Sequence, residues 1–260
     1  MSSRVSRTIQ ATNIAASPRP KMSRSKSHDT VSGQAELLAD IEANVNVAAK
    51  LFPEMTQNLR HFAGRYLSDE VAYQALLGVV SARSGEGRTT VALGLASALS
   101  EMFDRVALVE MGACKEGSTL ATELDLSMPI GLGEYIQDGL TLDDVLYETP
   151  SQKLWLLPAG TLLQKRGHLN ATTQTRDLLA ELRDSFDVVV VDLPPLLENE
   201  EAPALVRQFD GLIVVVNAGR TTKQEVQKTL GLVQPAPVRG VLLNKLEHRV
   251  PEWISSLISP

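Results

Sequence analysis

The stretch Ala82-Arg-Ser-Gly-Glu-Gly-Arg-Thr-Thr90 decides the fold, because it has the composition of a loop that wraps a phosphate group. It follows a predicted strand over residues 78–82 and opens a predicted helix over residues 89–102, which is the context that such a loop requires. Its glycines let the backbone approach a ligand, and the helix N-terminus adds a partial positive charge. The residues expected to bind a nucleotide here are Ser84, Gly85, Glu86, Gly87, Arg88, Thr89 and Thr90.

A second element, Asp187-Val-Val-Val-Val-Asp192, is an apolar run that ends in a carboxylate. Many buried strands end in aspartate, but the order of this run after the glycine-rich loop indicates a Walker B element. Such an aspartate holds a magnesium-bound water, while the hydroxyl at the position of Thr89 ligates the metal. We therefore predict a nucleotide with Mg²⁺ as ligands, and Thr89 and Asp192 as the metal-side residues. The alternative is a glycine-rich turn that binds nothing, and the Walker B element weakens it.

Strands and helices alternate along the rest of the chain. Strands are expected at residues 78–82, 105–110, 154–157, 187–192, 211–217 and 238–244, and helices at residues 89–102, 173–184, 202–208 and 223–232. Apolar runs such as VVVV and LIVVV, separated by amphipathic helices, indicate a parallel sheet covered on both faces. We therefore predict an α/β fold with a doubly wound, mostly parallel sheet of the P-loop NTPase type. The loop should lie at the carboxyl end of a central strand, with Asp192 ending the neighbouring strand close to Thr89.

The chain divides into three segments by composition. Residues 1–33 are rich in Ser, Arg, Thr, Ala and Pro and read as a disordered basic tail. A solvated tail is the simplest interpretation, and contact with anionic lipid headgroups or an organellar transit peptide are the alternatives. Residues 34–66 are expected to form a helical N-terminal extension, in which Pro53 ends one helix or starts another. Residues 67–260 then form the P-loop domain, which is expected to begin with a helix over residues 67–77.

Charge and cysteine content limit the function classes. The formal net charge is −6, and the basic tail leaves the remainder clearly acidic. An acidic body argues against a broad nucleic-acid footprint, so no nucleic-acid partner is expected. Cys114 is the one cysteine, which fits a reducing compartment. No apolar run approaches the ~20 residues that span a bilayer, and no secretory signal is recognisable, so we expect a cytoplasmic protein.

Five segments carry a family resemblance between Leu67 and Leu246: SARSGEGRTTVALGLASALSE, VALVEMGACKEGSTLATELDL, LWLLPAG, FDVVVVDLPPLLENEEAPALVRQFDGLIVVVNAGRT and VRGVLLNKL. In this order and spacing they resemble the ATPase domain of bacterial tyrosine kinases of capsular and exopolysaccharide biosynthesis, within the deviant-Walker P-loop class. The resemblance implies binding of ATP or ADP with Mg²⁺ and an adenine contact by Asn244. It also implies a membrane-embedded polysaccharide chain-length or co-polymerase partner, which would hold the chain at the inner face of the cell membrane.

Two departures from the family pattern bear on catalysis. Arg88 replaces the lysine that lies between the β- and γ-phosphates, and a longer, planar guanidinium cannot reproduce that position. The family's second-strand Asp-x-Asp is Glu110-Met-Gly112 here, so one acid is lengthened and the other is absent. A metal or base displaced by an ångström can cost ~100-fold in rate. The expected catalytic positions are therefore Arg88, Glu110 and Asp192, with the first two degenerate.

Two further departures bear on assembly and phosphorylation. The family's charged pattern in the helix before the core, which joins subunits into a ring, aligns with Val71, Gln74 and Leu77. We therefore expect no ring through this helix, which leaves a homodimer across the nucleotide face open. The family's tyrosine-rich tail has no counterpart, because the sequence after Leu246 contains no tyrosine.

These departures favour a catalytically weak or inactive, nucleotide-sensitive adaptor over the two alternatives. The first alternative is an active ATP-dependent tyrosine autokinase of the same pathway. The second is a partitioning-type ATPase, but that class has a second lysine near the start of the loop, where this chain has Arg83. Glu198, Glu200 and Glu201 are expected to be solvated at a helix N-terminus, which the helix dipole favours.

Overall fold

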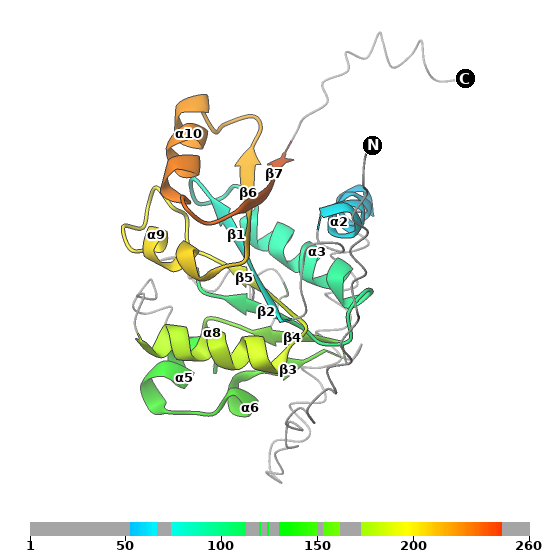
Figure 1. Ribbon diagram of the computed structural model, residues 1–260, viewed down its shortest axis with the longest axis vertical. Coiled ribbons are helices and arrows are strands. Elements are labelled where there is room, and N and C mark those ends of the chain that lie inside the picture. Colours follow the sequence, from blue (N-terminus) through cyan, green and yellow to red (C-terminus); the bar gives the residue numbers. More distant parts are fainter. Residues whose placement is uncertain are drawn as a thin grey trace, which may run out of the picture.

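A seven-stranded sheet forms the centre of the protein, with the strand order β3-β4-β2-β5-β1-β6-β7 (Figure 1). The computed structural model describes residues 53–66, 74–112, 120, 124, 130–149, 153–161 and 173–245. The strands are β1 Ala75–Ser81, β2 Val106–Glu110, β3 Tyr147–Glu148, β4 Leu154–Leu157, β5 Val188–Asp192, β6 Gly211–Asn217 and β7 Val238–Asn244. The helices are α2 Pro53–Tyr66, α3 Arg88–Ser100, α5 Leu132–Asp138, α6 Leu142–Val145, α8 Thr173–Ser185, α9 Ala202–Leu205, the 3₁₀ helix η1 Val206–Gln208, and α10 Lys223–Leu232.

The sheet is parallel apart from its first edge, where β3 and β4 pair antiparallel. Strand β1 is central: Leu77 lies opposite Val190 of β5 on one side and Gly211 of β6 on the other. Strands β1, β5 and β6 are buried along their whole length, as parallel strands covered on both faces should be. The predicted doubly wound, mostly parallel α/β fold is therefore confirmed.

Alternate valines of β5 show how the two layers are built. Val188 and Val190 pack in the apolar cluster that includes residues of α2 and α3. Val189 and Val191 pack in the cluster that includes residues of α8 and α9. This follows from the two-residue period of a strand, which sends neighbouring side chains to opposite faces. Figure 1 shows the same division, with α2 and α3 on one side of the sheet and α8, α9 and α10 on the other.

The prediction of a helix over residues 67–77 is wrong for its last residues. Residues 67–73 lie outside the described residues, but residues 75–77 belong to β1 and not to a helix. Gln74 has a φ of 74° and donates its N–H to Asp187 O at 2.8 Å, so the chain enters the sheet there. The apolar run from Ala75 onward fits a buried strand as well as a helix, and pairing on both sides decides for the strand.

The position of Leu77 in β1 bears on the predicted absence of a subunit ring. Leu77 is 1% exposed in the central strand, so it cannot stand on a surface helix that contacts another subunit. Val71 lies outside the described residues. The absence of a charged ring contact at these positions therefore stays a prediction without structural support.

Other element boundaries differ from expectation by only a few residues. Strand β1 begins three residues earlier than the predicted residues 78–82, and α3 begins at Arg88 and not at residue 89. The helix predicted over residues 202–208 is divided between α9 and the 3₁₀ helix η1. Pro53 starts α2, where a proline loses no hydrogen bond because the first helical N–H has no partner within the helix.

We predict that Phe62→Ala lowers the free energy of unfolding by about 3 kcal/mol. Phe62 of α2 packs so closely on β7 that a Cβ atom at Gly240 would lie 2.5 Å from its ring atom Cε2. Arg60→Ala on the same helix breaks an exposed ion pair to Glu101 and should cost less than about 1 kcal/mol. Urea denaturation of both variants checks this, and equal losses would contradict the docking of α2 through Phe62.

Candidate functional site

The predicted phosphate loop lies where the fold requires it, between the carboxyl end of β1 and the amino end of α3. Gly87 is the residue before α3 and has a φ of 85°, and Gly85 has a φ of 76°, both in the left-handed region. A Cβ atom at Gly87 would also collide with the Asn244 side chain. The loop therefore needs glycine here for backbone conformation and for space.

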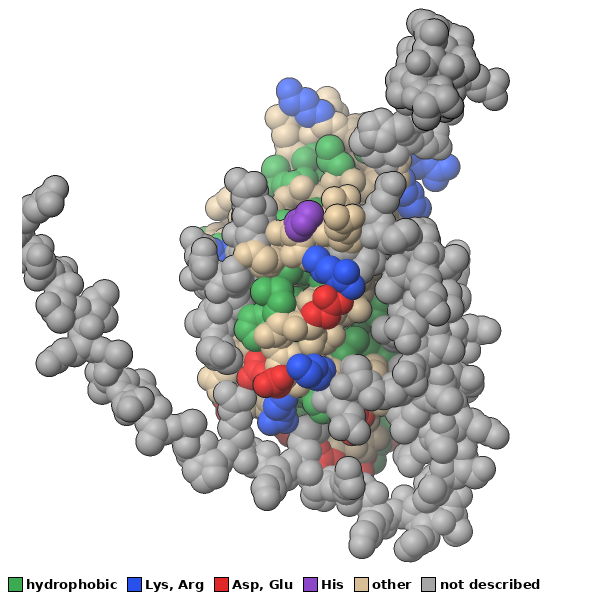
Figure 2. Space-filling model, turned by 90° about the vertical axis from the view of Figure 1, so that its right-hand side faces the viewer, with side chains coloured by type: hydrophobic (Ala, Val, Ile, Leu, Met, Phe, Trp, Pro, Cys, Tyr) green, Lys and Arg blue, Asp and Glu red, His purple; other side chains and the backbone are tan. Residues whose placement is uncertain are grey.

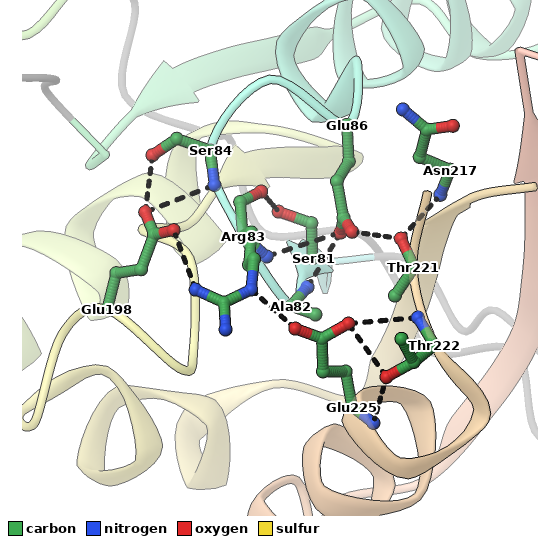
Figure 3. A network of polar contacts seen from close by, with 10 residues as sticks. All are labelled: Ser81, Ala82, Arg83, Ser84, Glu86, Glu198, Asn217, Thr221, Thr222 and Glu225. Carbon is green, nitrogen blue, oxygen red and sulfur yellow. Dashed lines mark hydrogen bonds and ion pairs between the residues drawn. The ribbon is translucent and has the colours of Figure 1, made fainter. Parts of the chain in front are cut away.

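Glu86 fixes the backbone of the loop through the hydrogen bonds that its carboxylate accepts. Its carboxylate is buried and accepts hydrogen bonds from Ala82 N at 2.8 Å and Arg83 N at 3.3 Å. The other carboxylate oxygen accepts from the Thr221 hydroxyl, which in turn accepts from Asn217 N at 3.2 Å (Figure 3). This chain of contacts ties the loop to the end of β6.

Arg88, expected at the lysine position of the loop, points into the protein. Its Nε donates to Asp192 Oδ1 at 2.5 Å, and its Nη1 donates to Ser81 Oγ at 3.3 Å. The side chain is only 6% exposed. The guanidinium therefore lies beneath the loop, across the ends of β1 and β5, and its charge faces a carboxylate.

Asp192 ends the neighbouring strand close to Thr89, as predicted from the sequence. Its Oδ2 accepts the Thr89 hydroxyl at 2.6 Å, so Arg88 and Thr89 engage both carboxylate oxygens. Burial raises the pKa of Asp192, and the charge of Arg88 and the hydrogen bonds from Thr89 and Arg88 oppose that shift. Asp192 is only 1% exposed, and a charge so far from water needs a partner.

The donor set of this site fits a phosphate group but does not fit Mg²⁺. The loop and the first turn of α3 offer the N–H groups and the dipole that bind phosphate. The metal-side carboxylate of Asp192, in contrast, is already ion-paired with Arg88. A second cation beside it would face the positive guanidinium in a buried position.

Glu110 and Gly112, which stand where the family has two acids, both have structural contacts. The Glu110 carboxylate is fully buried and accepts from Leu120 N and Ala159 N, each at 3.1 Å. A Cβ atom at Gly112 would lie 2.9 Å from Arg88 Nη2 and 2.9 Å from Leu193 O. Glu110 thus ties β2 to the turn after β4, and Gly112 leaves room for the guanidinium. The catalytic assignment of Glu110 stays a prediction.

Glu198 is exposed, as predicted, but its carboxylate binds the phosphate loop and not the N-terminus of a helix. Its Oε2 accepts from Ser84 N at 3.1 Å and from Ser84 Oγ at 2.7 Å (Figure 3). Asn199 binds the backbone at the start of α9, because its Oδ1 accepts hydrogen bonds from Glu201 N and Ala202 N. A carboxylate therefore occupies donors of the loop that were predicted to bind phosphate.

Arg83 is held by two acidic side chains, although about half of it is exposed. Its Nε lies 2.6 Å from Glu225 Oε1, and its Nη1 lies 3.7 Å from Glu198 Oε1. The backbone N–H of Thr222 and the side chain of Arg83 lower the pKa of Glu225 to about 2. Figure 3 shows Arg83 between the two carboxylates, which connects the loop to the start of α10.

The end of β7 also contacts the loop. Asn244 donates its amide N–H to Glu86 O at 2.9 Å, and Lys245 donates its Nζ to Gly85 O at 2.8 Å. The adenine contact expected of Asn244 stays a prediction. Lys245 places a further positive charge on the loop, and the sequence analysis did not single it out, because only sheet order brings β7 to this position.

The class of protein follows from this geometry. A glycine-containing loop at the carboxyl end of a central parallel strand opens a helix, and an aspartate ends the next strand, which defines the P-loop NTPase fold. The chain belongs to the AAA domain family, which it matches over residues 75–238. It is 25% identical to the tyrosine-protein kinase CpsD of Streptococcus agalactiae serotype III (strain NEM316) over 178 residues, which are 67% of this chain and 76% of that protein. The resemblance to bacterial tyrosine kinases is thereby confirmed.

Two solved structures share the fold. The VpsO kinase domain has a TM-score of 0.61 and 24% identity, covering 74% of this chain and 96% of that chain. A cobyrinic acid a,c-diamide synthase from Mycobacterium smegmatis, solved with an ATP analog and magnesium, has a TM-score of 0.51 and 22% identity, covering 64% and 72%. Both similarities establish the fold of this chain, and the bound ATP analog and magnesium belong to the synthase alone.

The described surface is mixed in character. On the face shown in Figure 2, hydrophobic, basic and acidic side chains of the described residues are interspersed. Within the described part of the chain, no helix has both the length and the apolar content to cross a membrane. The same residues contain no group of three or more His, Cys, Asp or Glu placed to hold a metal ion.

We expect Gly112→Ala to lower the free energy of unfolding by about 1–3 kcal/mol, because its Cβ meets both Arg88 and the backbone of Leu193. Gly64→Ala in α2 is the matched control, since its Cβ meets no atom within 4 Å outside its own helix turns. That control should be neutral or stabilise by up to about 1 kcal/mol. Thermal and urea unfolding measure both, and a harmless Gly112→Ala would show that the guanidinium does not lie against Gly112.

Proposed function

We propose that this protein is a nucleotide-sensitive adaptor of capsule or exopolysaccharide biosynthesis and export, with weak or no tyrosine kinase activity. It would bind ATP or ADP at the P-loop and contact a membrane-embedded polysaccharide chain-length or co-polymerase protein at the inner face of the cell membrane. The similarity to CpsD and related tyrosine-protein kinases supports the pathway and the partner. The contacts of Arg88 and Asp192 support the loss of catalysis.

The ion pair between Arg88 and Asp192 is the observation that carries this proposal. Phosphoryl transfer depends on positive charge placed at the transferring group and on a metal aligned with it. Here the loop's cation and the metal-side carboxylate neutralise each other at 2.5 Å. Neither charge is then available to the transition state, whereas the N–H groups of the loop still serve ground-state binding.

The described tyrosines support the same conclusion on the acceptor side. Tyr135 donates its hydroxyl to Glu181 at 2.7 Å, and Tyr147 donates to Ile130 O at 3.1 Å. Burial raises the pKa of both phenols, so neither is a ready nucleophile. Tyr135 also lies beside a carboxylate that would repel a phosphate donor.

Nucleotide sensitivity is argued from Glu198, on the loop between β5 and α9. Its carboxylate is bound to Ser84, a residue predicted to bind phosphate. A phosphate group on this loop would compete with the carboxylate for the same donors and would repel its charge. Nucleotide binding is thereby coupled to the position of Glu198 and of the chain segment that carries it, which is a signal that a partner can read.

The kinase prediction is tested by mass spectrometry after incubation with Mg-ATP, together with an assay of ATP hydrolysis. We expect no tyrosine phosphorylation and very slow hydrolysis in the wild type. Arg88→Lys alone should recover little, because Gly112 still offers no carboxylate. A variant with Tyr135→Phe and Tyr147→Phe controls for background modification. Robust phosphorylation of Tyr66, Tyr73, Tyr135 or Tyr147 in the wild type would favour the alternative of an active autokinase.

The proposed role of Glu198 predicts tighter nucleotide binding by Glu198→Gln. Removing one negative charge about 4 Å from a bound phosphate is worth about 1 kcal/mol in a solvent-exposed site, or about fivefold in Kd. Glu200→Gln removes the same charge from an exposed neighbour in the same segment and should change Kd by less than about twofold. Titration calorimetry with ADP measures both. Equal effects of the two variants would mean that Glu198 acts only through net charge.

A further inference from the structure

We infer that this site takes a nucleoside di- or triphosphate as the metal-free anion, with the Arg88 guanidinium in place of the Mg²⁺ that P-loop proteins ordinarily use. The inference rests on the proposed nucleotide binding and concerns the form in which the nucleotide binds. Asp192 was predicted to serve a bound Mg²⁺, but in the structure it is paired with the Arg88 guanidinium.

The first support is that the guanidinium satisfies the metal-side groups as a cation would. Asp192 is 1% exposed, and its two oxygens accept from Arg88 Nε at 2.5 Å and Thr89 Oγ1 at 2.6 Å. Arg88 donates a further hydrogen bond to Ser81 Oγ, which is itself fully buried. The buried carboxylate therefore already has a positive partner with good geometry.

The second support is that the surrounding chain is shaped for arginine. Gly112 leaves a space that Arg88 Nη2 uses, and any Cβ there would approach that atom to 2.9 Å. The same Cβ would approach Leu193 O to 2.9 Å, so the acid that the family has at this position cannot be placed here without moving the backbone. The arginine and the glycine thus fit each other, and together they exclude a second metal-side carboxylate from this position.

The third support is that other positive groups can balance the charge of the phosphates. Lys245 Nζ donates to Gly85 O at 2.8 Å, at the exposed side of the loop. Arg83 on the same loop is already paired with Glu225 and Glu198, so its charge is largely taken up by those carboxylates. Lys245, together with the amino end of α3, therefore provides the positive charge that a nucleotide would otherwise bring with it as Mg²⁺. Mg²⁺ gives up its waters reluctantly and would have to enter beside a fixed guanidinium.

Titration calorimetry of the full chain with ADP and ATP tests this inference, once in excess EDTA and once in saturating Mg²⁺. We expect the wild-type Kd to change by less than about twofold between the two conditions. Binding that requires Mg²⁺, or is more than about tenfold tighter with it, would overturn the inference and leave the proposed nucleotide binding standing. No heat of binding and no thermal stabilisation in either condition would overturn both.

A variant makes the role of Arg88 separable from nucleotide binding in general. Arg88→Lys replaces the fork by a compact ammonium that cannot bridge Asp192 and Ser81, so binding should become at least about tenfold tighter with Mg²⁺ than in EDTA. Arg60→Lys is the matched control. Arg60 pairs with Glu101, just beyond the end of α3 opposite the loop, so this variant should bind nucleotide with the wild-type indifference to Mg²⁺. An Arg88→Lys protein with the wild-type indifference to Mg²⁺ would show that Arg88 does not replace the metal.

A second measurement avoids substitutions altogether, in case Arg88→Lys folds poorly. Electron paramagnetic resonance of Mn²⁺ reports whether the wild-type protein with ADP holds a metal ion beyond what free ADP holds. We expect the protein to bind ADP without binding Mn²⁺. The Mn²⁺ spectrum should then equal that of a protein-free solution with the same concentration of free ADP. A ternary complex that immobilises Mn²⁺ at one ion per chain would overturn the inference.

Discussion

The buried ion pair between Arg88 and Asp192 is the interaction on which the rest of the site depends. Neither charge is tolerable alone at this depth, and loss of one partner of such a pair typically costs about 3–5 kcal/mol. The pair lies where the start of α3 meets the end of β5, so it holds the phosphate loop down on the sheet. Gly112, at the end of the neighbouring strand β2, provides the space that makes the pair sterically feasible.

Around this pair, acidic side chains fix the phosphate loop from several directions. Glu86 supports it from behind, and Glu198 binds Ser84 from the segment after β5. Glu225 holds Arg83 from the start of α10. The loop is therefore preorganised, but part of its donor capacity is used by the protein's own carboxylates. In the proposed function a nucleotide would compete with Glu198 for Ser84, and this would couple occupancy of the loop to the segment leading into α9.

The residues that define the fold of this protein differ from those that bear on its chemistry. The parallel sheet, the loop and the aspartate at the end of β5 place it in the AAA domain family with relatives named tyrosine-protein kinases. The direction of one side chain, Arg88, changes what the same scaffold can do, because catalysis of phosphoryl transfer depends on charge placement and not on the fold. The proposed adaptor role needs only ground-state contacts of the kind that the N–H groups of the loop can offer.

The fold class, the six parallel strands and the place of the phosphate loop could be predicted from the sequence, because these follow from local patterns. The short elements α5, α6 and β3 were not predicted. Apolar runs, amphipathic periods and the glycines at 85 and 87 act within a few residues of one another. An apolar run from Ala75 onward was ambiguous between helix and strand, and only pairing on both sides decided it.

Tertiary structure alone decided where the charged side chains point. Arg88 and Asp192 are 104 residues apart, Ser84 and Glu198 are 114 apart, and Lys245 is 160 residues from the loop carbonyl it contacts. No local pattern encodes such contacts, since they depend on how strands from distant parts of the chain order themselves in one sheet. The sequence could therefore name Arg88 as a departure from the family, but only the folded chain brings it against Asp192 and Ser81.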